Sequence, residues 1–403
     1  MATSRVSERA DAGFSDRVGA SVSRVVSIDV LRGLVMVLMA IDHVRVYSGL
    51  PAGGPTAGIF FTRWITHFCA PAFVFFAGTS AFLSGRRQTR GDLARHLAIR
   101  GAWLVLLELT VIRLAWTFNV DYAHYILLGV IWMLGVCLIL MAPLVWLPTW
   151  AIAVFGLIVI GAQDLIGLAA GGLPSWLGQI LYFGGVFRAP FPGGPDGPAV
   201  AVLYSLVPWI GVMAAGYGFG AIVTRPAAER NRWCLTIGLT STALFLAIGG
   251  YFVLTHPARP GAPPMLFQLL NQRKYPASQL FLLMTLGPTI ALMPLADRAR
   301  GTIGRAIQNW LATFGRVPFF YYLLHIPLIH TVALIVSLLR EGRVDPWLFG
   351  NHPMMPGRVP DGYMYSLPLL YLVFAIVVAL LSLPCRWFAE SRLRQPSAWK
   401  RFL

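Results

Sequence analysis

Short loops divide the sequence into long apolar runs, and most of its arginines lie in those loops. A transmembrane helix needs about 20 predominantly apolar residues. Ten stretches meet this requirement, near residues 27–48, 64–84, 97–118, 124–146, 150–170, 199–223, 233–254, 277–296, 308–339 and 366–388. Only 12% of the residues are charged, against about 25% in a typical soluble domain. The sequence therefore predicts an all-α polytopic membrane bundle of about ten transmembrane helices.

The distribution of Lys and Arg predicts the orientation of this bundle, because cytoplasmic loops are enriched in these residues. Segments on the side of the N-terminus carry 20 of them, and loops on the opposite side carry 8. We therefore expect both termini in the cytoplasm. Residues 1–24 are expected to form a disordered cytoplasmic tail, 25–390 the transmembrane domain and 391–403 a basic cytoplasmic tail. The ninth run contains Pro318 and Pro327, which predict a kinked or broken helix.

Several function classes find no support in the sequence. The net charge of +16 lies mainly in loops between apolar runs, so it indicates topology and predicts no nucleic-acid partner. The four cysteines form no CxxC pair, so neither a disulfide framework nor a zinc site is indicated. No phosphate-binding loop and no Gly-x-Ser-x-Gly elbow is present.

The first run carries the densest set of charged residues inside the membrane. Asp29 and Arg32 form one i,i+3 pair, and Asp42 and Arg45 form a second beside His43. Arg32 and His43 are eleven residues apart, which on a helix is ~16 Å along the axis and a rotation of only ~20°. The spacing predicts one helix face with a cation in its inner half and an imidazole in its outer half. Charged groups at such depth need a partner, a water-filled cavity or a function.

Polar residues of other runs are expected in the same outer half of the bilayer. They are His67, His124, Lys274, Tyr321, His325 and His330. Imidazole is the usual general base near neutral pH, and a carboxylate such as Asp42 can orient it. A purely structural interpretation stays open, with Arg32 as an interfacial anchor and each histidine packed in the core. No HExxH-type spacing occurs, so no metal site is predicted.

The residues of this first run resemble the opening span of the heparan-α-glucosaminide N-acetyltransferase catalytic-domain family. The stretch that carries this resemblance begins with Ser-Ile-Asp-Val-Leu-Arg-Gly at 27–33 and continues to Asp42-His43. Further matching stretches are 71–78, 274–278, 283–288 and 315–325. The Arg-x10-His spacing is also similar to that of the broader transmembrane acyltransferase group.

This resemblance implies an integral membrane acyltransferase that moves an acyl group, usually acetyl, from cytosolic acyl-CoA to an acceptor at the outer face. The acceptor would be a glycan, a lipid or a small molecule, and acyl-CoA would be a co-substrate with no permanently bound cofactor. We expect catalytic roles for His43, Asp42, His67 and His325, and substrate or acyl-CoA binding by Arg32, Asp29, Arg45, Lys274 and Tyr321. His43 would act as general base or carry the acyl group transiently. The expected location is a bacterial inner (plasma) membrane, and a homo-oligomer stays open.

The sequence departs from the family pattern at the expected catalytic position. In lysosomal members the residue that matches His43 is Asn, and a histidine in the following loop is assigned to catalysis. Residues 44–66 contain no histidine here, so His43 or His67 would take this role, and heparan sulfate does not carry over as the acceptor. Two alternatives are a proton-coupled transporter or flippase, with buried His, Asp and Arg as a proton relay, and an accessory membrane subunit.

Overall fold

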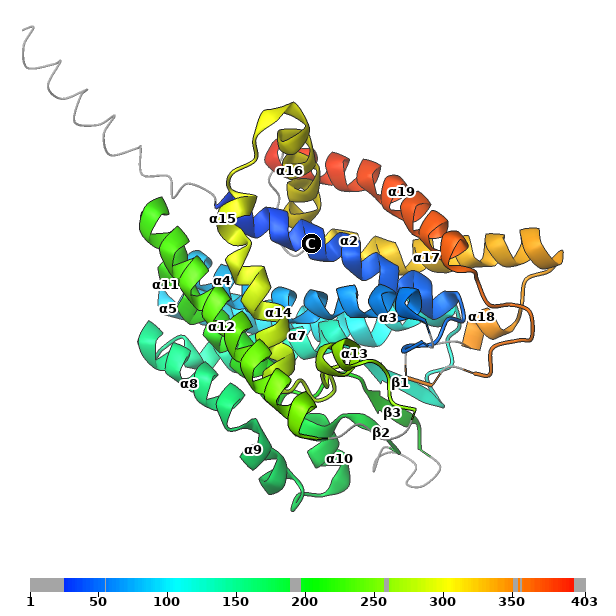
Figure 1. Ribbon diagram of the computed structural model, residues 1–403, viewed down its shortest axis with the longest axis horizontal. Coiled ribbons are helices and arrows are strands. Elements are labelled where there is room, and N and C mark those ends of the chain that lie inside the picture. The colour runs from blue at the N-terminus through cyan, green and yellow to red at the C-terminus, as the bar shows by residue number, and fades with distance from the viewer. Residues whose placement is uncertain are drawn as a thin grey trace, which may run out of the picture.

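The computed structural model describes residues 25–54, 56–188, 197–256, 261–350, 354–355 and 357–394. The predicted tail 1–24 lies outside these residues, and so do residues 395–403 of the predicted basic tail. The described chain is mostly helical (Figure 1). Its longer helices are α2 (Val26–Tyr47), α4 (Cys69–Gly85), α5 (Arg90–Leu107), α7 (Val130–Leu144), α8 (Thr149–Gly161), α11 (Val207–Val223), α12 (Ala227–Thr255), α14 (Gln279–Ala291), α16 (Gly301–Arg316), α17 (Pro318–Glu341) and α19 (Leu367–Arg394).

Shorter helical elements connect or extend these helices. They are α3 (Ala57–Trp64), η1 (Ile65–Phe68), η2 (Glu108–Ile112), α6 (Arg113–Thr117), α9 (Gln163–Ala170), α10 (Ser175–Gly178), η3 (Gln179–Phe183), α13 (Met265–Leu270), α15 (Met293–Ala296) and α18 (Trp347–Gly350).

Five helical segments of the described chain are long and apolar enough to cross a membrane. They are Ala57–Gly85, Ala227–Thr255, Gln279–Ala296, Pro318–Glu341 and Leu367–Arg392. The pair α8 and α9, bent by 66°, makes a sixth if it forms one span. Helix α2 is long enough, but its four charged residues lower its apolar character. The count of ten spans and the cytoplasmic location of both termini stay predictions.

Helix α2 runs through the middle of the molecule, with α16, α17 and α19 on one side and α4 on the other (Figure 1). It crosses α16 with the two backbones in contact. A Cβ at Gly33 would lie 1.8 Å from the carbonyl oxygen of Leu311, and one at Gly315 would lie 1.8 Å from that of Asp29. Only glycine fits at these two positions, and the close crossing brings Asp29 and Arg32 beside the end of α16.

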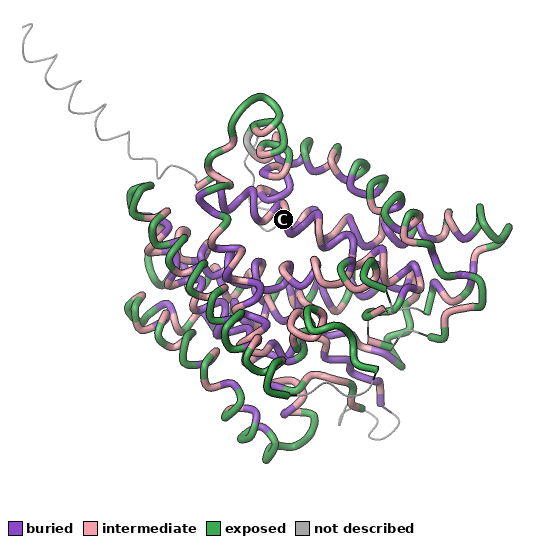
Figure 2. The backbone as a smooth tube through the Cα atoms, in the orientation of Figure 1, coloured by how far each residue is buried: buried purple, intermediate pink, exposed green. Residues whose placement is uncertain are grey.

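Burial decreases from this centre to the periphery. Figure 2 shows α2 largely buried and the outer sides of α8 and α12 exposed. The exposed side chains of the peripheral helices include large apolar residues such as Leu157, Leu254 and Leu383. A monomeric soluble protein rarely exposes contiguous apolar surface of this kind, whereas lipid tails solvate it.

The expected ninth span is two helices. Helix α16 ends at Arg316 and α17 begins at Pro318, and Val317 between them has a non-helical backbone (φ −130°, ψ 49°). A proline disfavours the helical conformation of the residue before it. Pro327 lies inside α17, which continues through it. The predicted break therefore occurs at the first proline.

A three-stranded sheet is the feature that the all-α prediction missed. Strands β1 (Tyr125–Leu128), β2 (Gly185–Arg188) and β3 (Ala199–Val202) lie in the order β1-β3-β2. Strand β1 pairs in parallel with β3, and β2 pairs with it antiparallel. The strands come from stretches that the sequence placed in two expected spans and a loop. Their runs of four residues are too short to show a strand periodicity inside longer apolar stretches.

Candidate functional site

Two cavities approach each other between α2, α7 and α17. The first, here called the histidine cavity, has a volume of about 150 Å³ and is lined by Asp42, His43, His67 and Lys274, among others. The second, the arginine cavity, has a volume of about 340 Å³. It is lined by four arginines, Arg32, Arg100, Arg316 and Arg392, together with Asp29, His96, Ser80 and a wall of apolar side chains.

Helix α2 contributes side chains to both cavities. Arg32 and Met36 line the arginine cavity, and His43 lines the histidine cavity. Residues four and eleven positions apart on a helix are rotated by only ~40° and ~20°, so these three side chains share one stripe. One helix thus connects a cationic cavity to an imidazole-bearing cavity ~16 Å farther along its axis.

His43 is held by a second histidine from a distant part of the chain. Nδ1 of His43 lies 2.6 Å from Nε2 of His325, and Nδ1 of His325 lies 2.6 Å from the carbonyl oxygen of Tyr322. A carbonyl oxygen can only accept, so Nδ1 of His325 carries a hydrogen and its Nε2 accepts from Nδ1–H of His43. In the neutral rings, this leaves Nε2 of His43 as the nitrogen with the free lone pair.

The rings around His43 also restrict its orientation. Trp116 packs edge-on against it at 4.9 Å, and His325 stacks on it at 4.7 Å between centroids. Trp116 itself lines the histidine cavity and is 3% exposed. His43 therefore has a fixed tautomer and a fixed ring plane, the two properties that a general base needs.

His67 lies in the same cavity with different surroundings. It is 3% exposed, and neither ring nitrogen has a hydrogen-bond partner among the described residues. Phe281 packs edge-on against it at 5.5 Å. A buried polar group without a partner costs about 1–3 kcal/mol, and both nitrogens of this ring are buried in this way at the wall of the histidine cavity. His67 thus has hydrogen-bonding capacity without the fixed tautomer of His43.

The charges of the histidine cavity are arranged around Asp42 and Lys274. Asp42 forms an ion pair with Arg45 at 2.9 Å, and the pair predicted from the sequence is therefore present. Lys274 is 9% exposed, and its ammonium lies over the rings of Tyr204 at 5.7 Å and Tyr275 at 5.1 Å. Burial alone would lower the pKa of Lys274, but Tyr275 and the carboxylate of Asp42 raise it above its ordinary value. Lys274 is a cation at neutral pH, and it forms no ion pair with a described carboxylate.

Glu108 also lines the histidine cavity, and its carboxylate has a structural role. It is 1% exposed and accepts hydrogen bonds from the backbone N–H groups of Ile131 at 3.0 Å and Trp132 at 3.2 Å. These are N–H groups of the first turn of α7, which have no partner within the helix. The carboxylate therefore fixes the start of α7. The expected fourth span, 124–146, is helical only from this point on, because its first residues form strand β1.

Arg32 lines the arginine cavity, and its side chain is hydrogen-bonded to α4. Its guanidinium donates to the carbonyl oxygen of Phe76 at 2.5 Å and to the hydroxyl of Ser80. At the other wall, Arg392 donates to the carbonyl oxygen of Arg316 at 3.2 Å, and Nε of Arg316 is buried without a hydrogen-bond partner in the described chain. Four guanidinium groups around a cavity with one carboxylate, Asp29, make it suited to a polyanion.

The remaining predicted residues lie in different places. Tyr321 is fully buried between Phe314 and His325 and lines neither cavity, whereas its neighbour Tyr322 lines both. His330 stacks on Tyr47 at 4.7 Å and is likewise absent from both walls.

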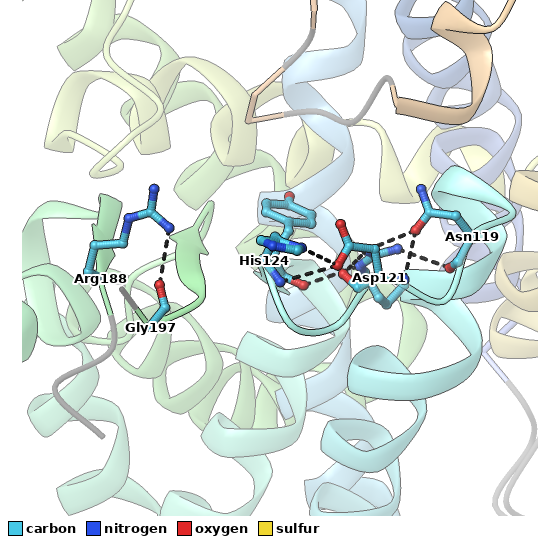
Figure 3. Close-up of polar contacts among 7 residues, drawn as sticks. Asn119, Asp121, His124, Arg188 and Gly197 are labelled. Carbon is cyan, nitrogen blue, oxygen red and sulfur yellow. Dashed lines mark hydrogen bonds and ion pairs between the residues drawn. The ribbon is translucent and has the colours of Figure 1, made fainter. Parts of the chain in front are cut away.

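His124 is separate from the other histidines. Figure 3 shows it beside Asp121 in the loop before β1, with Arg188 and Gly197 paired nearby. Nδ1 of His124 lies 2.7 Å from the Asp121 carboxylate, and 81% of its side chain is exposed. The hydrogen bond from His124 lowers the pKa of Asp121. The expected convergence of five histidines is thus a convergence of His43, His67 and His325, with His330 and His124 elsewhere.

Sequence reasoning missed several residues that form the cavity walls. Arg100 and Arg392 were counted as topology signals, and Ser80 and Tyr204 carried no distinguishing pattern. Tyr322 belongs with Tyr321, His325 and His330 to the polar residues of the ninth run, but the binding role was predicted for Tyr321 instead. Their roles depend on which helices pack together, which local spacing does not encode. Within the part of the chain that the structure describes, no three His, Cys, Asp or Glu side chains are grouped so that they could hold a metal ion.

Comparison with known protein families gives one match. The model of the family described as heparan-alpha-glucosaminide N-acetyltransferase, catalytic, matches residues 24–254, more than half of the 403 residues. The chain belongs to this family. A search of curated proteins finds no match. Membership in this acetyltransferase family, together with the apolar helices, indicates an integral membrane protein of the acetyltransferase class.

The family match covers only part of the site. It includes Arg32, His43 and His67, and it ends before Lys274, Tyr322 and His325. The contacts of His43 with His325, and of Lys274 with the histidine cavity, therefore come from the structure and not from the matched range.

Proposed function

We propose that this protein is a membrane acetyltransferase that takes an acetyl group from cytosolic acetyl-CoA and delivers it to a hydroxyl or amine acceptor at the opposite face. The observation that carries this proposal is the hydrogen-bonded pair of His43 and His325, which leaves Nε2 of His43 as a base in a cavity beside the arginine cavity. We place it in the plasma membrane of a bacterium.

The arginine cavity would bind the donor. Coenzyme A carries several phosphate oxygens, and guanidinium groups recognise phosphate through paired, charge-assisted hydrogen bonds. Arg32, Arg100, Arg316 and Arg392 provide such groups, and apolar residues such as Leu134 and Leu138 provide a wall for the uncharged arm of the donor. The excess of positive loops at this end of α2 supports a cytoplasmic location for this cavity.

The histidine cavity would bind the acceptor and carry out the transfer. Nε2 of His43 takes the proton of the acceptor hydroxyl or amine as the acceptor atom attacks the thioester carbonyl. Nδ1–H of His43 stays bound to His325, which stabilises the imidazolium that forms. The carbonyl oxygen becomes negative in the tetrahedral intermediate, and the ammonium of Lys274 stabilises this charge.

Collapse of the intermediate completes the reaction. The C–S bond breaks, the acetyl group stays on the acceptor, and the CoA thiolate takes the proton that His43 removed. His67 would bind the acceptor, because it lines the histidine cavity and its ring nitrogens have no partner among the described residues. Asp42, which is ion-paired with Arg45, would also help to keep the Lys274 ammonium charged, because its carboxylate raises the pKa of Lys274. The transporter or flippase alternative gains no support from the family match.

The first test is donor binding. Purified protein in detergent is titrated with acetyl-CoA by calorimetry, and proteoliposomes then receive radiolabelled acetyl-CoA with glucosamine as the probe acceptor. We expect the parent protein to bind acetyl-CoA and to label the amino sugar. His43→Ala should bind acetyl-CoA equally well and should not label the sugar. Absence of acetyl-CoA binding by the parent would refute the proposal.

A further inference from the structure

The two cavities share two wall residues, Val130 and Tyr322. Each cavity is otherwise lined by its own set of side chains. Val130 opens α7, and Tyr322 lies in the second turn of α17, one turn after Phe319 of the arginine cavity. These two side chains therefore contact both the cavity of the arginines and the cavity of His43.

The two sides of this wall differ in how firmly they are held. On the α7 side, Glu108 binds the N–H groups of Ile131 and Trp132, which fixes the turn that carries Val130. On the α17 side, the carbonyl oxygen of Tyr322 is bound by His325. The Tyr322 hydroxyl, however, makes no hydrogen bond to a described residue. Its ring is held by packing alone, including an edge-on contact with His325 at 4.9 Å.

We infer that Tyr322, together with Val130, is a movable partition between the donor and acceptor cavities. This inference rests on the proposed function. The side chain of Tyr322 rotates to admit the acetyl thioester to His43, and in its closed position it separates the thioester from the contents of the histidine cavity. An active site that excludes water protects a reactive group from hydrolysis. Tyr322 is thus a positioning residue that sets the ratio of acetyl transfer to hydrolysis.

The side reaction that the partition suppresses follows from the proposed chemistry. Water in the histidine cavity would replace the acceptor, and Nε2 of His43 would take its proton as the oxygen attacks the thioester carbonyl. The C–S bond breaks, the thiolate takes the proton from His43, and acetate and CoA are the products. No acceptor is consumed, so this reaction can be measured although the natural acceptor is unidentified.

The kinetic test measures hydrolysis of acetyl-CoA by the purified protein without an acceptor. Removing the ring with Tyr322→Ala should raise the hydrolysis rate about tenfold, since water would then reach the thioester. Tyr322→Phe keeps the ring and should hydrolyse at the parent rate. Val130→Ala, which opens the wall from the other helix, should raise hydrolysis to a smaller extent and serves if Tyr322→Ala folds poorly. Phe320→Ala is the matched control, because Phe320 stacks on Phe388 and lines neither cavity.

A second test measures the partition without any enzyme activity. Ala77 lines the arginine cavity alone, and Ala77→Cys places a thiol there. Sealed vesicles of both orientations are treated with a membrane-impermeant, charged methanethiosulfonate, and labelling of the four buried native cysteines is subtracted with the parent protein. We expect Cys-substituted protein to be labelled from one side of the membrane only. Adding Tyr322→Ala should make the same position accessible from both sides.

Each result decides the inference. Labelling from both sides with Tyr322 present, or one-sided labelling together with unchanged hydrolysis after Tyr322→Ala, would overturn the partition. A parent protein that binds no acetyl-CoA would instead refute the proposed function, and the labelling result would still decide whether Tyr322 separates the two cavities.

Discussion

The two cavities are built in opposite ways. The histidine cavity is small, and the groups around its proposed base are fixed by specific contacts, such as the bond of His43 to His325 and the ion pair of Asp42 with Arg45. The arginine cavity has more than twice the volume and combines cations with apolar walls. The difference indicates a division of labour. Fixed tautomers and ring planes serve a chemical step, whereas distributed cations beside apolar surface serve the binding of a long amphipathic anion.

The strongest test of this division is replacement of His43 in the histidine cavity. His43→Ala should lower acetyl transfer by about 10²–10⁴-fold, the usual contribution of a general base, and should leave the affinity for acetyl-CoA unchanged. Transfer assays in proteoliposomes and calorimetry measure the two quantities separately. The matched control is His124→Ala, because His124 is exposed outside both cavities and should have parent activity. Equal loss in both variants would contradict the assignment.

Replacement of Arg32 should produce the opposite pattern. Arg32→Gln removes one charged donor from the arginine cavity, which is worth about 1.5–3 kcal/mol and corresponds to a loss of about 10–100-fold in acetyl-CoA affinity. The turnover rate at saturating donor should change little. Calorimetric titration and a full dependence of rate on donor concentration measure this split. Arg87→Gln removes the same charge from an exposed position and should bind like the parent.

His325 lines neither cavity, but it is hydrogen-bonded to His43, the proposed base. Its replacement should therefore lower the turnover rate and leave substrate binding unchanged. His325→Phe removes the acceptor for Nδ1–H of His43, and a hydrogen bond worth about 1 kcal/mol predicts a loss of about fivefold in turnover. The KM for acetyl-CoA should stay constant. His325→Gln offers an amide oxygen in place of Nε2 and should recover part of the turnover.

The control for His325 is His330→Phe, a buried histidine farther along the same helix that lies outside both cavities. A purely structural role of His325 would give equal losses for the two histidines and no recovery with Gln. Turnover in detergent, normalised to folded protein by size-exclusion chromatography, distinguishes the cases.

The smallest expected effect on catalysis concerns Glu108. Although Glu108 lines the histidine cavity, its hydrogen bonds assign it to the start of α7. Glu108→Ala leaves two backbone donors without a partner and should lower the free energy of unfolding by about 1–2 kcal/mol, the usual value of a helix cap. Glu108→Gln keeps an acceptor oxygen and should lose less.

Thermal unfolding in detergent checks the effect of Glu108, with a lower midpoint expected for Glu108→Ala than for Glu108→Gln. Acetyl-CoA affinity should be unchanged in both. A loss of turnover in Glu108→Gln as large as in His43→Ala, without loss of stability, would move Glu108 from the structural to the catalytic group.

The sequence by itself determined the helical membrane character and the layout of α2. Apolar runs of about 20 residues predict where most of the long helices form, and the helical period places Arg32, Met36 and His43 on one face. The motif at residues 27–43 also indicated the family that the comparison found. These properties are local, since each depends only on residues within one or two helices.

The tertiary structure decided which residues meet. His43 and His325 are separated by 282 positions, and Arg32 and Ser80 by 48. No spacing rule predicts such contacts, because they depend on how close two backbones approach, as at Gly33 and Gly315. Packing also decided that Tyr322 and not Tyr321 faces the cavities, and that short apolar stretches pair as a sheet. The sequence determined the chemical groups on each helix, and packing determined their partners.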